Sequence, residues 1–219
     1  MHAMSVEAPI GTSAELGERV YLGKQIINLM GPEGCGKTVI SKKLAAESGM
    51  PRVVFGDIFR DLAANDLGPF GNECRTMFAE HRYMKPRILA KIITDIFRQE
   101  DLANGFIIDG AMRTVGEVKT FNRMLKKAER VMPVANVLLR VPGWMGVERI
   151  LKGASARNRP IEDSINGTLG RMSNYYSELG KRASLIQKQP DWRLIHIDGI
   201  GTPDEVFTRV RTALTENIA

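Results

Sequence analysis

A glycine-rich segment near the N-terminus constrains the possible folds of this chain most strongly. Residues 31–38, GPEGCGKT, fit the phosphate-binding pattern G-x-x-x-x-G-K-[ST]. The apolar run 25–30 before it predicts a strand, and Val39, Ile40 and Leu44 after it recur at helical spacing. This order suits phosphate binding, because backbone N–H groups and a helix N-terminus then face the phosphate oxygens. The segment therefore predicts a phosphate-binding loop rather than a glycine-rich turn capped by a threonine.

Within this loop, Lys37 is expected to bridge the outer phosphates of ATP, and the Thr38 hydroxyl to ligate Mg²⁺. The thiol of Cys35 lies near a helix N-terminus, where its pKa would fall and a redox role is conceivable. We favour the alternative, a small residue that fits the loop. The residues expected to bind ATP here are Gly31, Gly34, Cys35, Gly36, Lys37 and Thr38.

Short apolar runs alternate with helical periodicity along the rest of the chain, which predicts an α/β fold. The predicted strands are 25–30, 52–55, 105–109, 134–141 and 192–198. We expect a five-stranded parallel sheet covered by helices on both faces, as in P-loop NTPases. The alternation of strands and helices is interrupted at about 56–103 and 149–171. We expect these two stretches to be insertions.

The length of 219 residues indicates one domain, which we place at 25–219 after a flexible extension, 1–24. Two cysteines and three histidines exclude a disulfide scaffold and a close-spaced zinc site. The net charge of +6 favours anionic partners. No apolar run reaches the length of a membrane span, and no secretory signal is evident. We therefore expect a cytoplasmic protein that does not bind a membrane.

A second acidic motif, FIIDG, ends a predicted strand at Asp109. Ligands of α/β proteins bind at this edge of the sheet, so Asp109 could hold Mg²⁺, partly through water. No glutamate follows it to activate a water molecule, which favours transfer to an organic acceptor over hydrolysis. The alternative is an ordinary strand-end acid that caps a turn.

Several segments in the right order resemble one enzyme family. Residues 104–114, NGFIIDGAMRT, resemble the signature N-G-F-[LI]-[LI]-D-G-F-P-R-T of adenylate kinases and related nucleoside monophosphate kinases. Residues 56–60, GDIFR, are similar to the family's G-D-x-x-R, 149–171 resemble a short lid without zinc ligands, and 197–199 resemble the final strand. The resemblance runs from about Gln25 to the C-terminus. It implies transfer of the γ-phosphoryl group of Mg-ATP to a nucleoside monophosphate, with the insertions as acceptor-binding region and lid.

The resemblance also implies roles for individual residues. Arg60 and Arg113 would clamp the acceptor phosphate, and Arg149, Arg171 and either Arg157 or Arg159 would close over the transferred group, with Arg149 also binding ATP. The implied catalytic set is Lys37, Arg113, Arg149, Arg159 and Arg171. The implied acceptor set is Gly56, Asp57, Arg60, Gly110, Arg113 and Glu117. The alternatives are solvated surface arginines, or an ion pair between Asp57 and Arg60 on one helix face.

Two departures from the family pattern concern the acceptor. Ala111 and Met112 replace a Phe-Pro pair whose proline commonly follows a cis bond, which would cost about 3–4 kcal/mol without proline. Glu117 stands where adenylate kinases place a base-reading glutamine. An ionised carboxylate only accepts hydrogen bonds, which suits guanine or an amino-bearing pyrimidine better than adenine. Glu117 could instead be a solvated residue near a helix start.

These departures leave two other functions open beside the nucleoside monophosphate kinase. One is a P-loop kinase of another small acceptor, and the other is a catalytically weak protein that binds ATP or RNA. The kinase interpretation implies ATP, Mg²⁺ and a nucleoside monophosphate as ligands, no nucleic-acid partner, and a monomer.

Overall fold

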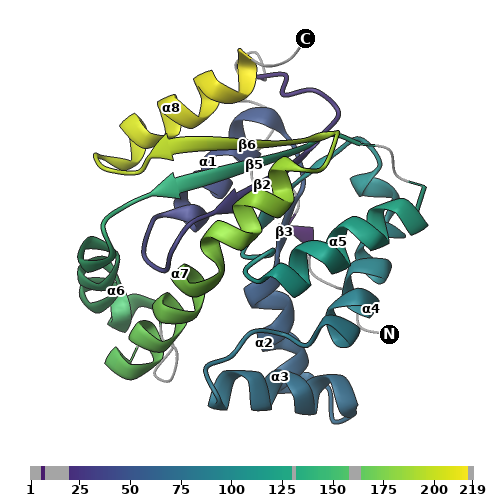
Figure 1. The fold of residues 1–219 in the computed structure, drawn as a ribbon, viewed down its shortest axis with the longest axis vertical. Coiled ribbons are helices and arrows are strands. Elements are labelled where there is room, and N and C mark those ends of the chain that lie inside the picture. The colour runs from purple at the N-terminus through teal and green to yellow at the C-terminus, as the bar shows by residue number, and fades with distance from the viewer. Residues whose placement is uncertain (1–5, 8–19, 130–131, 158–163, 217–219) are drawn as a thin grey trace.

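A computed structural model describes residues 6–7, 20–129, 132–157 and 164–216 of the chain (Figure 1). The strands are β1 (Val6–Glu7), β2 (Ile26–Met30), β3 (Arg52–Val54), β4 (Phe106–Asp109), β5 (Val134–Arg140) and β6 (Trp192–Asp198). The α-helices are α1 (Lys37–Ser48), α2 (Phe55–Asn65), α3 (Pro69–Ala79), α4 (Pro86–Phe97), α5 (Val115–Lys127), α6 (Gly143–Arg157), α7 (Ile165–Gln187) and α8 (Pro203–Thr215). A short 3-10 helix, η1 (Glu100–Leu102), precedes β4.

The strands form one sheet in the order β1-β3-β4-β2-β5-β6. All neighbouring pairs are parallel except β1 and β3, which are antiparallel. From β2 the chain crosses to β3 and β4 on one side, and later to β5 and β6 on the other. The direction of winding thus reverses beside β2, and ligands of open parallel sheets bind at such a switch point, outside the carboxyl ends of the strands.

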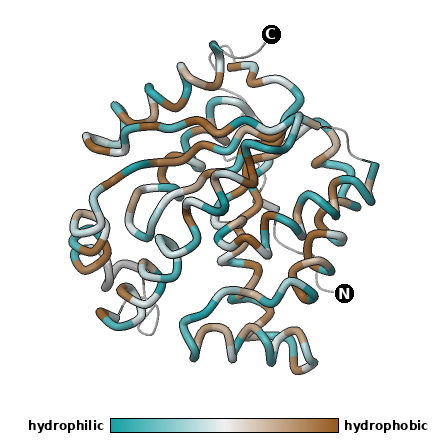
Figure 2. The backbone as a smooth tube through the Cα atoms, in the orientation of Figure 1, coloured by the Kyte–Doolittle hydropathy of each residue, from teal (hydrophilic) through white to brown (hydrophobic). Residues whose placement is uncertain are grey.

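Alternate residues of the buried strands pack into two separate cores, because successive side chains of a strand face opposite sides of the sheet. On one face Ile26 and Ile108 pack with residues of α2, α3, α4, α5 and α7. On the other face Ile27 and Ile107 pack with residues of α1 and α8. Helices therefore cover both faces, and Figure 2 shows hydrophobic residues gathered along the strands between them.

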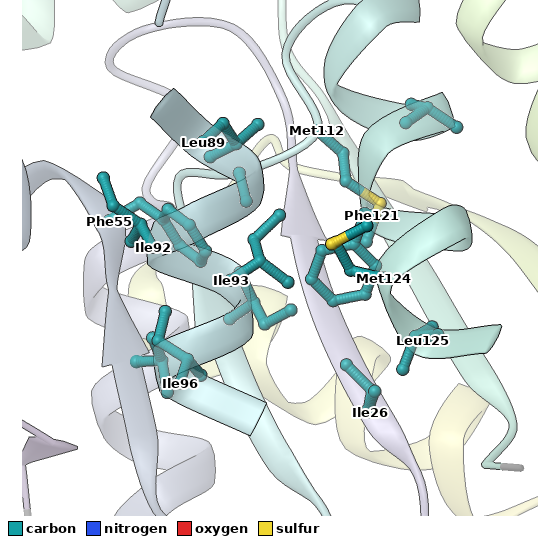
Figure 3. Packing of buried hydrophobic residues seen from close by; sticks show 14 of the residues in the cluster. Ile26, Phe55, Leu89, Ile92, Ile93, Ile96, Met112, Phe121, Met124 and Leu125 are labelled. Carbon is teal, nitrogen blue, oxygen red and sulfur yellow. The ribbon is translucent and has the colours of Figure 1, made fainter. Parts of the chain in front are cut away.

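The first of these cores includes the packing between α4 and α5. The apolar stripe of α4, spaced three and four residues apart, points toward Phe121 and Met124 of α5 and toward Ile26 of the central strand (Figure 3). Phe121 contacts Phe97 edge to face at a centroid distance of 5.4 Å. This packing anchors the insertion between β3 and β4 to the sheet.

The predicted architecture is confirmed: five parallel strands lie within two residues of their expected bounds, and helices cover both faces. Two elements lie where no helix was predicted, α6 and the long α7. The N-terminal stretch left out of the predicted fold contributes β1, which pairs with β3, and the buried Leu22. No helix among the described residues is both long and apolar enough to cross a membrane.

Candidate active site

A cleft of about 640 Å³ opens at the carboxyl ends of the central strands. Its walls come from the loop after β2, from α2 and α3, from the loop after β4, and from α6 and α7. Most of the predicted site residues line this cleft: Gly34, Gly36, Lys37, Thr38, Gly56, Asp57, Arg60, Asp109, Gly110, Arg113, Glu117, Arg149 and Arg171. Residues separated by more than one hundred positions in the sequence thus meet around one volume.

The phosphate-binding loop has the geometry that its sequence predicts. Gly36, the N-cap of α1, has a φ of 97°, a left-handed conformation that glycine adopts without strain. The ammonium of Lys37 lies back over the loop and donates hydrogen bonds to the carbonyl oxygens of Gly31 and Pro32, both at 2.8 Å. The exposed Thr38 is the second residue of α1. The lysine and the threonine hydroxyl are therefore both at the helix N-terminus, where anions bind.

Three residues of the loop, Gly31, Pro32 and Cys35, are buried. Cys35 is 2% exposed and belongs to the core between the sheet and α1. Burial raises the pKa of the Cys35 thiol, although Lys37 lies 3.5 Å from its sulfur. A Cβ on Gly31 would overlap the Cys35 sulfur and approach the Leu139 carbonyl oxygen to 2.8 Å. These contacts favour a packing role for Cys35, because a buried protonated thiol is a poor nucleophile.

Asp109 ends β4 and is only 3% exposed. One of its carboxylate oxygens accepts hydrogen bonds from the Ser41 hydroxyl at 3.1 Å and from the Arg52 guanidinium at 3.2 Å. Arg52 comes from the neighbouring strand β3 and is 2% exposed. The buried ion pair with Arg52 fixes the orientation of the Asp109 carboxylate, which lines the cleft. Ser41 and Arg52 were not predicted, because neither stands in a recognisable motif.

On α2, Asp57 and Arg60 form the ion pair expected from their spacing. Gly56 lacks a side chain beside them, and a Cβ there would lie 3.1 Å from an Arg60 nitrogen. Arg60 nevertheless lines the cleft. Arg60 can therefore pair with Asp57 and still belong to the site.

Glu117 is not the solvated residue that one alternative expected, since it is 4% exposed. One oxygen of its carboxylate accepts a hydrogen bond from the backbone N–H of Arg113 at 2.7 Å. Burial raises the pKa of Glu117, and the hydrogen bond from Arg113 opposes that rise. Glu117 thus lines the cleft and also holds the backbone of the loop that carries Arg113.

The same loop is held from its other side by Arg182 of α7. The Arg182 guanidinium donates hydrogen bonds to the carbonyl oxygens of Met112 at 2.9 Å and Tyr175 at 3.1 Å, and it stacks on the Tyr175 ring at 4.3 Å. No cis peptide bond occurs in the described parts of the chain, and Met112 has a φ of 55°. A left-handed methionine costs about 1–2 kcal/mol. Arg182 and Glu117 together therefore hold a strained loop in which Ala-Met replaces Phe-Pro.

Arg182→Met is expected to lower the free energy of unfolding by about 3 kcal/mol, because two buried carbonyl oxygens lose their donor. Arg182→Lys, which keeps a charge and a donor, should recover part of that loss. Urea denaturation measures both values, and Lys181→Met, at the exposed neighbouring position, is the control. Equal stability of Arg182→Met and the control would contradict this role.

Arg113 and Arg171 approach each other in the middle of the cleft. Arg113 extends over Gly110, where a Cβ would come within 2.8 Å of its guanidinium, and it lies 5.8 Å from the Tyr83 ring. The Tyr83 hydroxyl donates a hydrogen bond to the Arg171 carbonyl oxygen at 3.1 Å. Burial raises the pKa of Tyr83 to about 12, so this hydroxyl keeps its proton at neutral pH. Tyr83, which the sequence did not single out, therefore links both arginines.

Helix α6 places Arg149 in the wall of the cleft and touches the phosphate-binding loop directly. A Cβ on Gly34 would overlap the backbone of Gly146, and a Cβ on Gly146 would overlap the carbonyl oxygen of Glu33. Only a pair of glycines permits this approach. Of the two alternative lid arginines, Arg157 is the last residue of α6, and Arg159 lies outside the described residues.

Comparisons with known proteins agree with this arrangement. Residues 29–190 match the family model described as adenylate kinase. The chain belongs to the adenylate kinase family. An adenylate kinase of Thermus thermophilus is 32% identical over 192 residues, which cover 87% of this chain and 97% of that protein. An adenylate kinase of Micrococcus luteus is 30% identical over 187 residues, covering 85% of this chain and 88% of the relative.

A third member of the adenylate kinase family, the adenylate kinase of Mycobacterium leprae, is 32% identical over 187 residues, or 85% of this chain and 97% of that protein. The match confirms the family and the P-loop fold that the sequence predicted. It also makes the chain a phosphotransferase, as predicted, and nothing in the comparisons favours the other two functions.

Proposed function

We propose that this adenylate kinase family member transfers the γ-phosphoryl group of ATP to a nucleoside monophosphate. The observation that carries the proposal is the meeting of Lys37, Arg60, Arg113, Arg149 and Arg171 around one cleft. Five cations around a single volume suit two phosphorylated ligands, whose negative charges must be brought together for transfer. Phosphoryl transfer depends mainly on such positioning and electrostatic stabilisation.

ATP binds at the end of the cleft formed by the loop after β2. The backbone N–H groups of Gly34 and Gly36 surround its phosphates, together with those of Gly31 and Cys35 beneath them. Lys37 leaves the carbonyl oxygens of its own loop and bridges the outer phosphates. Arg149 of α6, the helix that packs against this loop, also binds the donor.

Mg²⁺ is expected to bind between ATP and two residues of the chain, Thr38 and Asp109. Among the described residues no three acidic, cysteine or histidine side chains gather at one point, so this part of the chain offers no complete metal cage. One hydroxyl and one oriented carboxylate fit Mg²⁺ nonetheless, because this ion keeps several waters and takes its other ligands from phosphates. When bound, it would neutralise charge on the phosphates. Asp109 would hold this ion partly through water molecules.

The acceptor binds at the other end of the cleft, against Gly56, Asp57 and Gly110. Arg60 and Arg113 bind its phosphate, since a guanidinium fork matches two phosphate oxygens at once. Arg171 stabilises charge on the transferred group, with Arg159 as a further lid arginine. Residues 56–103 and 149–171 close over the ligands and exclude water.

Glu117 reads the acceptor base in this proposal. Its second carboxylate oxygen is available for a base N–H group while the first accepts from Arg113. Glu117→Gln is expected to raise the preference for AMP over GMP by about tenfold, the worth of one hydrogen bond. The glutamine oxygen can still accept from Arg113, so the loop is kept. Competition between the two acceptors measures the ratio, with Glu100→Gln as control, and an unchanged ratio would remove Glu117 from base reading.

The experiment that tests the proposal supplies Mg-ATP with AMP, GMP, CMP, UMP or dTMP, one at a time, and resolves the nucleotides formed. Formation of a diphosphate from at least one of them supports the proposal and identifies the base. Failure with all five, with ATP binding intact, would overturn it. We also propose that the protein is a cytoplasmic monomer and has no nucleic-acid partner.

A further inference from the structure

The phosphate-binding loop carries a carboxylate at one of its variable positions, Glu33. Its side chain is 21% exposed and lines the same cleft as the arginines. A negative charge in a loop that binds phosphates is unfavourable unless cations balance it. The position of Glu33 therefore calls for a role that neither the phosphate-binding motif nor the proposed function assigns.

One carboxylate oxygen of Glu33 lies 3.6 Å from Arg113 Nη1 and also 3.6 Å from Arg171 Nε. The two arginines come from the loop after β4 and from α7, so their side chains are brought together only by the fold. Glu33, from the loop after β2, lies between these two side chains and pairs with both. All three side chains are largely shielded from solvent, with exposed fractions of 21%, 27% and 13% for Glu33, Arg113 and Arg171.

A carboxylate and a phosphate present similar oxygen acceptors to a guanidinium group. In the proposed function a phosphate contacts Arg113 and Arg171. That phosphate would have to take the position in which the Glu33 carboxylate now pairs with these arginines. Glu33 could instead serve as a general base, but phosphoryl transfer between positioned phosphates depends mainly on positioning and electrostatic stabilisation and needs little help from a base. Competition for the arginines is the better account of this geometry.

We propose that Glu33 is an internal counter-anion that holds Arg113 and Arg171 together until the phosphate of an incoming ligand displaces it. This inference rests on the proposed function for the identity of that ligand. Before binding, Glu33 offsets the repulsion between two neighbouring cations. On binding, the phosphate takes over both arginines, and the cost of releasing Glu33 lowers the apparent affinity for phosphate-bearing ligands.

Titration calorimetry without catalysis tests this inference, using inorganic pyrophosphate, AMP and adenosine as probes. Glu33→Gln is expected to bind pyrophosphate and AMP about three- to tenfold more tightly, the worth of a partly exposed ion pair. Adenosine, which lacks a phosphate, should bind as it does to the unchanged protein. Glu33→Ala should give the same shift, and thermal unfolding checks that both variants are folded.

Glu47→Gln, which removes a carboxylate that pairs with Arg211 on the far side of α1, is the matched control and should change none of the three affinities. Weaker or unchanged binding of both anions by the two Glu33 variants would overturn the inference. An equal gain for adenosine would do the same, because it would not depend on charge. Failure of the wild-type protein to phosphorylate any acceptor, with these shifts present, would overturn the proposed function alone.

Discussion

Replacing Lys37 with alanine should reduce kcat/KM by about 100- to 1,000-fold, the usual cost of losing one donor that stabilises transition-state charge. In the structure, the Lys37 ammonium donates to the carbonyl oxygens of Gly31 and Pro32, both parts of its own loop. Those oxygens lie on one short loop, so water can replace the lysine there at small cost to folding. Lys37→Ala should therefore lose phosphoryl transfer and keep its free energy of unfolding.

A coupled assay of ADP formation, together with thermal unfolding, separates these two effects for Lys37→Ala. The matched control is Lys43→Ala on the same helix, because Lys43 pairs with Asp204 on the protein surface. The control should keep its activity. Transfer at the wild-type rate by Lys37→Ala would contradict the role given to the phosphate-binding loop.

The second large effect is expected for Arg113→Lys. A lysine keeps the positive charge but offers no planar fork, so it cannot bind two oxygens of the acceptor phosphate at once. We expect kcat/KM for the acceptor to fall about 100-fold. Binding of ATP alone should change little, because Arg113, which lies over Gly110, binds the acceptor in the proposed function.

Steady-state kinetics with varied acceptor measures this loss. Arg123→Lys is its control, since Arg123 is exposed on α5, the helix that follows the loop of Arg113. An equal loss of ATP affinity in Arg113→Lys would point to general disturbance of the cleft. Unchanged kinetics would place the acceptor phosphate elsewhere.

The loop after β2 and the parallel strands were predictable because their signals are local. Glycines at fixed spacing mark the loop, and strands buried on both faces are mainly apolar, as in 26–30 and 106–108. Helix α4 has an equally local signal, since Pro86 opens it and its apolar residues form a single stripe. These elements depend on neighbours in the sequence and so are visible in it.

Other features depend on contacts between distant residues. Nothing near Arg182 indicates that its guanidinium binds the carbonyl oxygen of Met112, 70 positions earlier. Burial of Arg52 against Asp109 is hidden for the same reason, since arginine is usually exposed. Only Glu33 carried a local signal, because a carboxylate inside a phosphate-binding motif is unexpected on electrostatic grounds.

The helices α6 and α7 escaped prediction for a different physical reason. Their exposed faces carry apolar side chains, among them Trp144 at 67% and Ile165 at 59% exposure, so no clean polar face marks a helix. Glycines within both helices weaken the helical propensity further. Their positions follow from packing against the sheet and the phosphate-binding loop.

The central claim is that the γ-phosphoryl group of ATP passes to a nucleoside monophosphate without reaching water. Phosphorus NMR of a reaction with Mg-ATP and the accepted monophosphate follows every product at once. The account predicts ADP and the acceptor's diphosphate in equal amounts, with no inorganic phosphate formed. Consumption of ATP that yields inorganic phosphate, with the monophosphate left unchanged, would contradict it.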